Sequence, residues 1–281
     1  MPPTIKLLGI CGSPIEDGNT QKIMEYALAS ARKLENVETE IFLTAKKKYS
    51  PCTHCNWCMF KGEHGKYCGV KDDLQPLFPM VLEADAILFA TPVYISKMSG
   101  YMAGVIDRLR AFMFGKHRGS IKNKVVGAIS VAWLRHAGIE TCGQSIYNSA
   151  FCLEMIPVSV HHSGAFLGAG ALSSIGGDGT FDPSDKVQVL KDEWGMRGAH
   201  DIAVRMVELA RIIKAGMIAL TQEGTDSHIL SVSPIAREVW SRKGLSLEKP
   251  GPEEIDYETE STAKMIDSRK TGYKRPETEE L

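Results

Sequence analysis

The stretch IKLLGICGSPIEDGNT, residues 5–20, determines how the rest of the sequence is interpreted. Its first part, Ile5 to Ile10, is an apolar run with the length of a buried strand, and the residues after Thr20 have helical spacing. The turn between them, from Gly12 to Thr20, is rich in small and hydroxyl-bearing residues. Because backbone N–H groups and the helix dipole attract anions, such a turn at the start of a helix predicts a phosphate site.

The side chains of this turn have two explanations. Ser13, Asn19 and Thr20 can donate hydrogen bonds to a phosphate. An ordinary helix cap at Asn19 or Thr20 would explain the same residues. The turn has neither the Gly-x-Gly-x-x-Gly spacing nor a P-loop lysine, so neither a dinucleotide nor a triphosphate is expected there.

Strand and helix patterns alternate along most of the chain, which is typical of βαβ units and a parallel sheet. The strands are expected at residues 5–10, 38–42, 86–90, 125–131 and 156–160. The helices are expected at residues 21–34, 74–83, 99–112, 139–151 and 199–220. Five strands joined by helical crossovers predict a doubly wound α/β sheet.

We expect one domain over residues 1–220 and a polar extension over residues 221–281. The chain has 281 residues, of which 43% are hydrophobic, and this is enough for one well-packed domain. The domain contains a cysteine-rich loop at residues 50–72 and a glycine-rich segment at residues 161–183, which we expect to be a long loop or lid. The extension is dense in Glu, Lys, Pro and Thr, and we expect it to contact a neighbouring subunit or a partner.

Charge and composition limit the classes of partner. The 33 Lys and Arg residues nearly balance the 34 Asp and Glu residues, so no strong field would attract nucleic acid or an anionic membrane. The N-terminal apolar run is too short for a signal peptide, and no stretch has the length of a membrane span. Seven cysteines fit a reducing compartment better than a disulfide framework, so we expect a cytoplasmic protein.

The third expected strand ends in a second motif, TPVYISKMSG at residues 91–100, and the helix after it ends in Ile-Asp-Arg at residues 106–108. Together with Gly-Ser-Pro and Gly-Asn-Thr in the first turn, this motif resembles the NADPH-dependent FMN reductase and flavodoxin-like family over residues 4–220. The resemblance implies a flavodoxin-like sheet of order 2-1-3-4-5 that holds FMN at its carboxyl edge. It also implies that the first turn binds the FMN phosphate and the second motif lines the flavin ring. The implied residues are Ser13, Gly18, Asn19 and Thr20, then Pro92, Val93, Tyr94 and Ser96.

The fourth expected strand runs into the loop 132–140, where the family places a third flavin contact. That contact commonly has paired glycines, whereas this loop has only Gly138. By position, Trp133 could stack on the flavin, and Arg135 could supply positive charge near its N1 atom. Both residues could instead simply cover the end of the strand.

The cysteine-rich loop contains PCTHCNWC at residues 51–58, followed by Cys68. A C-x-x-C-x-x-C run can wrap three corners of a cubane cluster, with a more distant cysteine as the fourth ligand. Zinc sites more often pair two C-x-x-C knuckles, and the loop lacks a second one. The three remaining cysteines, Cys11, Cys142 and Cys152, are expected to be small buried residues rather than ligands.

This loop resembles that of the iron-sulfur flavoproteins, a branch of the same family. The resemblance implies a [4Fe-4S] cluster near FMN, with Cys52, Cys55, Cys58 and Cys68 as ligands. The gap before Cys68 is longer than is usual in that branch. Zinc or unmetallated thiols are the alternatives for this loop.

The expected function is electron transfer between FMN and the [4Fe-4S] cluster, with a ferredoxin-like redox protein or a small molecule as partner. One alternative is an NAD(P)H-dependent FMN or quinone reductase without a cluster, and another is a non-enzymatic redox sensor. No catalytic side chain is identified, because the redox chemistry belongs to the cofactors. The family resemblance implies a homodimer or homotetramer.

Overall fold

The computed structural model describes residues 3–63 and 65–222 of the chain. The extension expected at residues 221–281 therefore lies outside the described residues, apart from the last two residues of the final helix. Within the described ranges, no helix combines the length and apolar character needed to cross a membrane.

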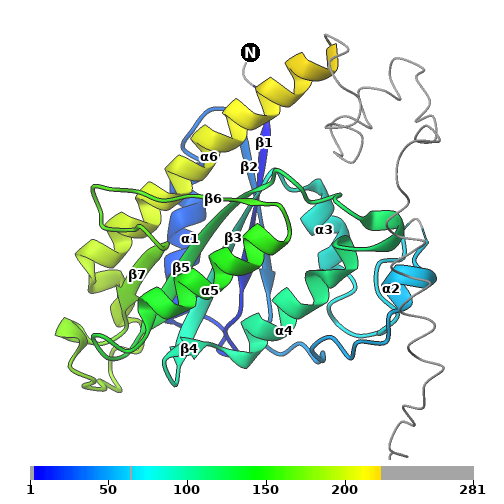
Figure 1. The fold of residues 1–281 in the computed structure, drawn as a ribbon. Helices are drawn as coiled ribbons and strands as arrows, with labels where there is room; N and C mark the ends of the chain where they lie inside the picture. The colour runs from blue at the N-terminus through cyan, green and yellow to red at the C-terminus, as the bar shows by residue number, and fades with distance from the viewer. Residues whose placement is uncertain (1–2, 64, 223–281) are drawn as a thin grey trace, which may run out of the picture. The chain divides into compact units, whose positions relative to one another are not determined.

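The core is a parallel sheet whose path is β2-β1-β3-β5-β6 (Figure 1). Its strands are β1 (Ile5–Cys11), β2 (Val37–Leu43), β3 (Ala86–Tyr94), β5 (Val125–Ala132) and β6 (Ile156–Pro157). These are the five strands expected from the sequence, and the expected order 2-1-3-4-5 is confirmed. β5 is buried along its whole length, and β1 is buried at all but one of its 7 positions. Continuous apolar runs of this kind are needed where helices cover both faces of a sheet.

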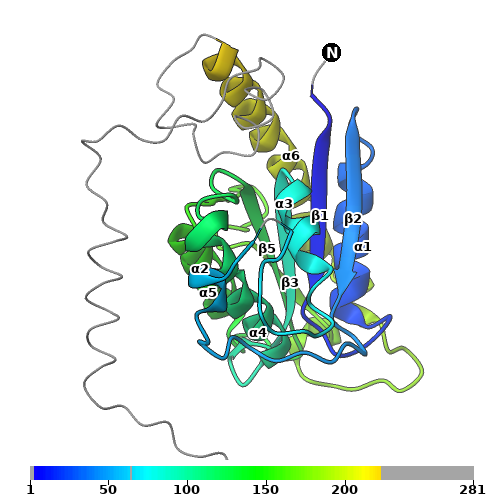
Figure 2. The same cartoon turned by 90° about the vertical axis from the view of Figure 1, so that its right-hand side faces the viewer.

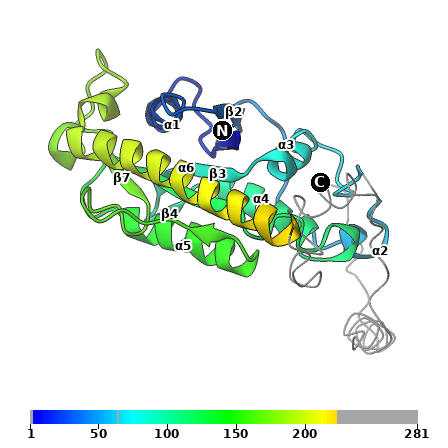
Figure 3. The same ribbon diagram turned by 90° about the horizontal axis from the view of Figure 1, so that it is seen from above.

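Helices cover the two faces of this sheet. They are α1 (Asn19–Ala31), α3 (Leu77–Glu83), α4 (Gly100–Arg108), α5 (Ile139–Cys152) and α6 (Glu193–Gln222), with α2 (Trp57–Phe60) as a single turn in the cysteine-rich loop. α1 and α6 pack on one face, whereas α3, α4 and α5 pack on the other. Figures 2 and 3 show α1 and α5 on opposite sides of the sheet. Alternate residues of β1 face the two cores, so Leu7 lies in the core that contains α1 and α6 and Leu8 in the core that contains α3, α4 and α5.

Two short strands were not expected, and the sheet has 7 strands within the described residues. β4 (Lys97–Met98) pairs antiparallel with the end of β3. β7 (Ala169–Leu172) pairs with β5 beyond the point where β6 ends, so the expectation of a loop across residues 161–183 is wrong there. Alanine and glycine are weak strand formers, and β7 exists because Ala169 and Ala171 are buried in the core that contains α6.

Several helix boundaries differ from the sequence-based expectation. α1 begins at Asn19 and ends at Ala31, whereas residues 21–34 were expected. α3 begins at Leu77 rather than at residue 74, and α6 begins at Glu193 rather than at residue 199. The helix expected over residues 99–112 ends at Arg108 and continues as a short 3-10 turn, η1 (Leu109–Phe112). This change of helix type places the residues after Arg108 against the cysteine-rich loop.

The carboxyl ends of the parallel strands lie at one edge of the sheet. β1 and β3 are neighbours there, and the helices that follow them, α1 and α4, cover opposite faces. In doubly wound sheets, ligands bind at such a reversal of chain direction. The loops at this edge are therefore the first place to look for a site.

Candidate functional site

The turn after β1 is held by hydrogen bonds on both of its sides. The Ser13 hydroxyl accepts from the backbone N–H of Ile15 at 3.2 Å. The Ser13 carbonyl accepts from the Thr44 hydroxyl, at the end of β2, also at 3.2 Å. Ser13 and Thr20 are both buried, so packing as well as hydrogen bonds holds the turn.

Asn19, the first residue of α1, connects this turn to the segment before α6. Its side-chain amide donates to the carbonyl of Lys186 at 2.9 Å, and its Oδ1 accepts from the N–H of Val189 at 2.9 Å. In this structure the side chain therefore anchors that segment. The N-cap of α1 is Gly18 and no side chain caps it, so the alternative of an ordinary cap at Asn19 or Thr20 is wrong.

The loop after β3 forms a tight hairpin with β4. Ile95 and Ser96 are its two turn residues, and their φ angles are 49° and 58°. Left-handed backbone at both positions is the geometry of a type I′ turn. Pro92 and Val93 precede the turn, and Tyr94 and Ile95 project from it with 41% and 92% of their surface exposed.

Ser99 joins the first and second loops. Its hydroxyl donates to the carbonyl of Gly12 at 2.5 Å and, as the N-cap of α4, accepts from the N–H of Met102 at 3.0 Å. Its own N–H donates to the Thr91 hydroxyl at 3.1 Å. The ends of β1 and β3 are thus held together at the start of α4.

The loop after β5 reaches the second loop at Gly138. This glycine has a φ of 103°, and a Cβ built on it would lie 2.6 Å from the carbonyl oxygen of Ser96, so only glycine fits. Trp133 is half exposed. The Arg135 guanidinium donates to the carbonyl of Gly176 at 2.6 Å, so in this structure it holds the loop after β7.

Large apolar side chains are exposed on the loops after β1, β3, β5 and β7. They are Ile15, Tyr94, Ile95, Trp133, Leu134, Ile175 and Phe181. Exposed apolar side chains gathered at one edge indicate a surface for a planar ligand or for another protein. The structure thus brings the predicted phosphate turn and the two predicted ring-lining loops to the same edge.

The second group of candidate residues lies between β2 and α3. All four cysteines of this loop line one pocket, together with two arginines. The pocket is lined by Cys52, Cys55, Cys58, Cys68, Arg108 and Arg110, among others. Its space, including the part open to solvent, is about 320 Å³. Burial raises the pKa of the Cys58 thiol, and the nearby charge of Arg110 opposes that rise.

The cysteines outside this loop do not take part in the pocket. Cys11 and Cys142 are buried, as expected. Cys152 is exposed, so the expectation of burial was wrong for this residue. It is the last residue of α5, where the helix leaves the core.

A single metal ion and a cluster place different demands on the four thiols. In the two described ranges, no three His, Cys, Asp or Glu side chains form a group that could hold one ion. A tetrahedral zinc ion with bonds of about 2.3 Å needs its sulfur ligands about 3.8 Å apart. In a [4Fe-4S] cluster each thiolate binds a different iron, so the sulfurs lie farther apart. The four cysteines that line the pocket supply the number and type of ligands that such a cluster needs.

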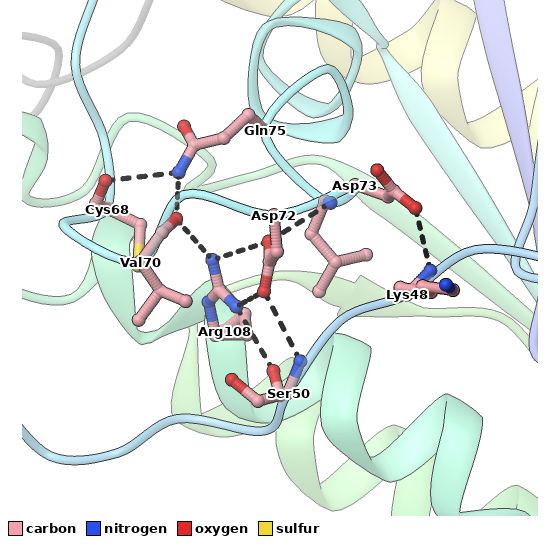
Figure 4. Close-up of polar contacts among 9 residues, drawn as sticks. Lys48, Ser50, Cys68, Val70, Asp72, Asp73, Gln75 and Arg108 are labelled. Atoms are coloured by element: carbon pink, nitrogen blue, oxygen red, sulfur yellow. Dashed lines mark hydrogen bonds and ion pairs between the residues drawn. The ribbon is translucent and has the colours of Figure 1, made fainter.

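Arg108 and Asp72 hold the two ends of the cysteine-rich loop together (Figure 4). Nη1 of Arg108 donates to Oδ2 of Asp72 at 2.7 Å and to the carbonyl of Ser50 at 3.1 Å. Nη2 donates to the carbonyl of Val70 at 3.3 Å. Asp72 in turn accepts from the N–H groups of Ser50 at 3.3 Å and Leu74 at 3.1 Å. Since Ser50 precedes and Val70 follows the cysteines, this ion pair fixes the span of the loop.

The ion pair is buried, and the side chains of Arg108 and Asp72 are only 1% and 11% exposed. Burial opposes ionisation of Asp72, but the Arg108 guanidinium and two backbone N–H groups outweigh it, so the pKa of Asp72 lies below its usual value. Sequence analysis did not identify this pair. The available signal was that Arg108 follows Met102 and Val105 at helical spacing, on the buried side of α4.

Two arginine side chains present donor groups at the pocket, and the Arg108 guanidinium interacts with the side chain of Cys68 there. Nε of Arg108 and Nη1 of Arg110 are buried and have no hydrogen-bond partner among the described residues. Buried N–H groups are almost always bonded, and charged ones are costly to leave unpaired. A cluster offers anionic sulfur acceptors, so the lining of this pocket fits one.

Comparison with known proteins relates this chain to a family of flavoproteins. The family profile of the NADPH-dependent FMN reductases matches residues 5–165. An iron-sulfur flavoprotein of Methanocaldococcus jannaschii is 31% identical over 210 residues, which cover 75% of this chain and 100% of the relative. An iron-sulfur flavoprotein of Archaeoglobus fulgidus is 34% identical over 207 residues, which cover 72% of this chain and 96% of the relative.

Solved structures show the same fold at low sequence identity. RosB with bound 8-demethyl-8-formylriboflavin-5'-phosphate aligns with a TM-score of 0.59 at 15% identity, over 99% of this chain and 100% of that chain. A flavone reductase aligns with a TM-score of 0.51 at 18% identity, over 75% of this chain and 64% of that chain. The sequence matches show the family as well as the fold. This chain belongs to the NADPH-dependent FMN reductase family, in its iron-sulfur flavoprotein branch, and is an FMN-containing oxidoreductase.

Proposed function

We propose that this chain transfers electrons between FMN and a [4Fe-4S] cluster. The observation that carries the proposal is the single pocket lined by all four cysteines of one loop. The names of the relatives, which are iron-sulfur flavoproteins, support it. The proposed ligands are Cys52, Cys55, Cys58 and Cys68. When bound, the cluster would accept and donate one electron at a time.

The proposed FMN site is the carboxyl edge of the sheet. FMN can exchange two electrons with a hydride donor and single electrons with a one-electron carrier. We propose that Ser13, Gly18, Asn19, Thr20 and the first backbone N–H groups of α1 bind its phosphate. The proposed ring-lining residues are Pro92, Val93, Tyr94, Ser96, Trp133, Arg135 and Gly138.

Helix α4 connects the two proposed sites within one subunit. Its N-cap, Ser99, holds the loops at the FMN edge, and its last residue, Arg108, lines the cysteine pocket. A helix of 9 residues that rises 1.5 Å per residue is about 14 Å long. A short, rigid element of this kind would keep the spacing between the two sites constant.

The proposed one-electron partner is a small ferredoxin-like redox protein. Cys55 is exposed at a pocket that is open to solvent, so a partner could approach the cluster there. The exposed apolar residues around the FMN edge are proposed to be covered by a second subunit of a homodimer or homotetramer.

A second candidate function is an NAD(P)H-dependent FMN or quinone reductase without a cluster. The match to the NADPH-dependent FMN reductases favours it. In that case the cysteine pocket would have no part in flavin reduction.

Stopped-flow reduction of the flavin under anaerobic conditions separates the two candidates. The donors are a reduced ferredoxin and NADPH, and the proteins are the wild type and Cys58→Ala. We expect reduced ferredoxin to reduce the flavin rapidly in the wild type and at least about tenfold more slowly in the variant. Rapid reduction by NADPH at equal rates in both proteins would support the second candidate and contradict the proposal.

The buried Thr20 hydroxyl gives a first prediction about FMN binding. In Thr20→Val the side chain keeps its shape and loses its hydrogen bond to the phosphate, so the Kd for FMN should rise roughly tenfold, or about 1.4 kcal/mol. Fluorescence titration measures this Kd. Riboflavin, which lacks the phosphate, serves as the control and should bind the two proteins equally. Equal FMN affinity in both proteins would place the phosphate elsewhere.

Gly138 gives a second prediction. In Gly138→Ala the added Cβ meets Ser96 in a backbone conformation that alanine avoids, so the second and third loops should separate. FMN affinity should fall roughly tenfold, which is about 1.4 kcal/mol. Gly164→Ala is the matched control, because Gly164 has a φ of 69° and no atom within 4 Å of the added Cβ. If Gly164→Ala lost as much FMN affinity as Gly138→Ala, backbone strain rather than the contact with Ser96 would explain the loss.

A further inference from the structure

Arg110 is held in place by the loop that carries the cysteines. It lies in η1, and its Nη2 donates to Oδ1 of Asn56 at 2.8 Å and lies 3.3 Å from Sδ of Met59. Asn56 stands between Cys55 and Cys58 in the sequence. The guanidinium is therefore oriented by the segment that is proposed to wrap the cluster, while Nη1 has no partner in the described part of the chain.

Arg108 presents a second unpaired donor at the same pocket. Both of its terminal nitrogens bond to Asp72 and to backbone carbonyls, and only Nε is buried without a partner among the described residues. The charge of Arg108 is balanced by Asp72 at 2.7 Å. The charge of Arg110 has no carboxylate beside it among its described partners. These partners are the amide oxygen of Asn56, the thioether of Met59 and the ring of Phe114.

We propose that Arg110, with Arg108 beside it, donates N–H···S hydrogen bonds to the cluster and raises its reduction potential. This inference rests on the proposed cluster. Reduction adds one electron, supplied by a one-electron donor such as a reduced ferredoxin, to a group that is already anionic. A cationic donor stabilises the more negative, reduced form more strongly, and hydrogen bonds to sulfur are a known determinant of cluster potential. No bond is broken and no proton is transferred in this step.

Redox titration of the cluster, followed by electron paramagnetic resonance under anaerobic conditions, tests the inference. The proteins are the wild type, Arg110→Gln, Arg110→Lys and the control Lys116→Gln. Lys116 is exposed in the same segment and does not line the pocket. In Arg110→Gln the ratio of reduced to oxidised cluster at a fixed potential should fall about tenfold, which is about 59 mV for one electron. The ratio for Arg110→Lys should lie between the ratios for Arg110→Gln and the wild type. The ratio for the control should differ from that of the wild type by less than about twofold.

Iron and sulfide are measured on every sample, so that a lower potential is not confused with a damaged cluster. An Arg110→Gln potential equal to that of the wild type, or no lower than that of the control, would overturn the inference. If Arg110→Gln does not retain the cluster, the resonance Raman spectrum of Arg110→Lys is measured instead. Fe–S(Cys) stretching frequencies equal to those of the wild type would overturn the inference. Shifted frequencies would support it. Wild-type protein without iron and sulfide would instead overturn the proposed function itself.

Discussion

Cys58→Ala should reduce the iron content of the anaerobically purified protein from about four atoms per chain to less than about one. Cys58 is the buried member of the C-x-x-C-x-x-C run and lines the pocket with the other three candidate ligands. Loss of one thiolate leaves one iron without its protein ligand, and the cluster should not survive purification. Iron and acid-labile sulfide assays measure the loss, and FMN content should remain near one per chain because the FMN loops are built from other residues.

Cys152→Ala is the matched control for this variant, because Cys152 is exposed at the end of α5 and does not line the pocket. It should retain its full iron and sulfide content. Cys68→Ala, prepared in parallel, should lose iron as Cys58→Ala does if the longer gap before Cys68 still allows it to act as the fourth ligand. Full iron content in Cys58→Ala would refute the assignment of this residue.

Asp72→Asn should lower the free energy of unfolding by about 3–5 kcal/mol, because it leaves the charge of Arg108 buried without its partner. Arg108 is only 1% exposed, so water cannot replace the lost carboxylate. The change should also free the two ends of the cysteine-rich loop and lower the iron content. Urea unfolding at neutral pH, followed by circular dichroism, measures the loss of stability.

The neighbouring residue provides the control for Asp72→Asn. Asp73 is exposed and accepts a hydrogen bond from the N–H of Lys48 at 2.7 Å, which an asparagine oxygen can also accept. Asp73→Asn should therefore cost less than about 1 kcal/mol. Equal losses in the two variants would show that the ion pair with Arg108 has no special role.

The stability difference between wild type and Asp72→Asn should also depend on pH. The pKa of Asp72 is lowered in the folded protein, so folding favours its ionised form. The contribution of the ionised Asp72 to the free energy of unfolding is fully present above about pH 3.9, which is the ordinary pKa of an Asp side chain. It is lost as the pH falls through the lower pKa that Asp72 has in the folded state. The difference between the two proteins should therefore be constant near neutral pH and should narrow in acid. A difference that persists unchanged in acid would contradict the ion-pair explanation.

The sequence was sufficient for β1, β3 and β5 because these central strands are buried along most of their length. Continuous apolar runs such as the one in β5 can be recognised without knowledge of their neighbours. β7 could not be recognised in this way, because its residues, Ala-Gly-Ala-Leu, form a strand only where β5 and α6 are already in place. The short helix α2 and the 3-10 turn η1 depend in the same way on contacts around the cysteine-rich loop.

Candidate site residues could be predicted where the residue type and its spacing alone suggest the chemistry. The cysteine spacing singled out the four cysteines that the structure places around one pocket. The role of Arg108 was not predictable, because its partners Ser50, Val70 and Asp72 come from parts of the chain that only the fold brings to the end of α4. For the same reason, the sequence could not show that the Asn19 side chain bonds to Lys186 and Val189.

The most direct test of the central claim is the content of iron, acid-labile sulfide and FMN in wild-type protein purified without oxygen. The account predicts about four irons, about four sulfides and about one FMN per chain. One FMN without iron or sulfide would contradict it and leave the NAD(P)H-dependent reductase as the better description.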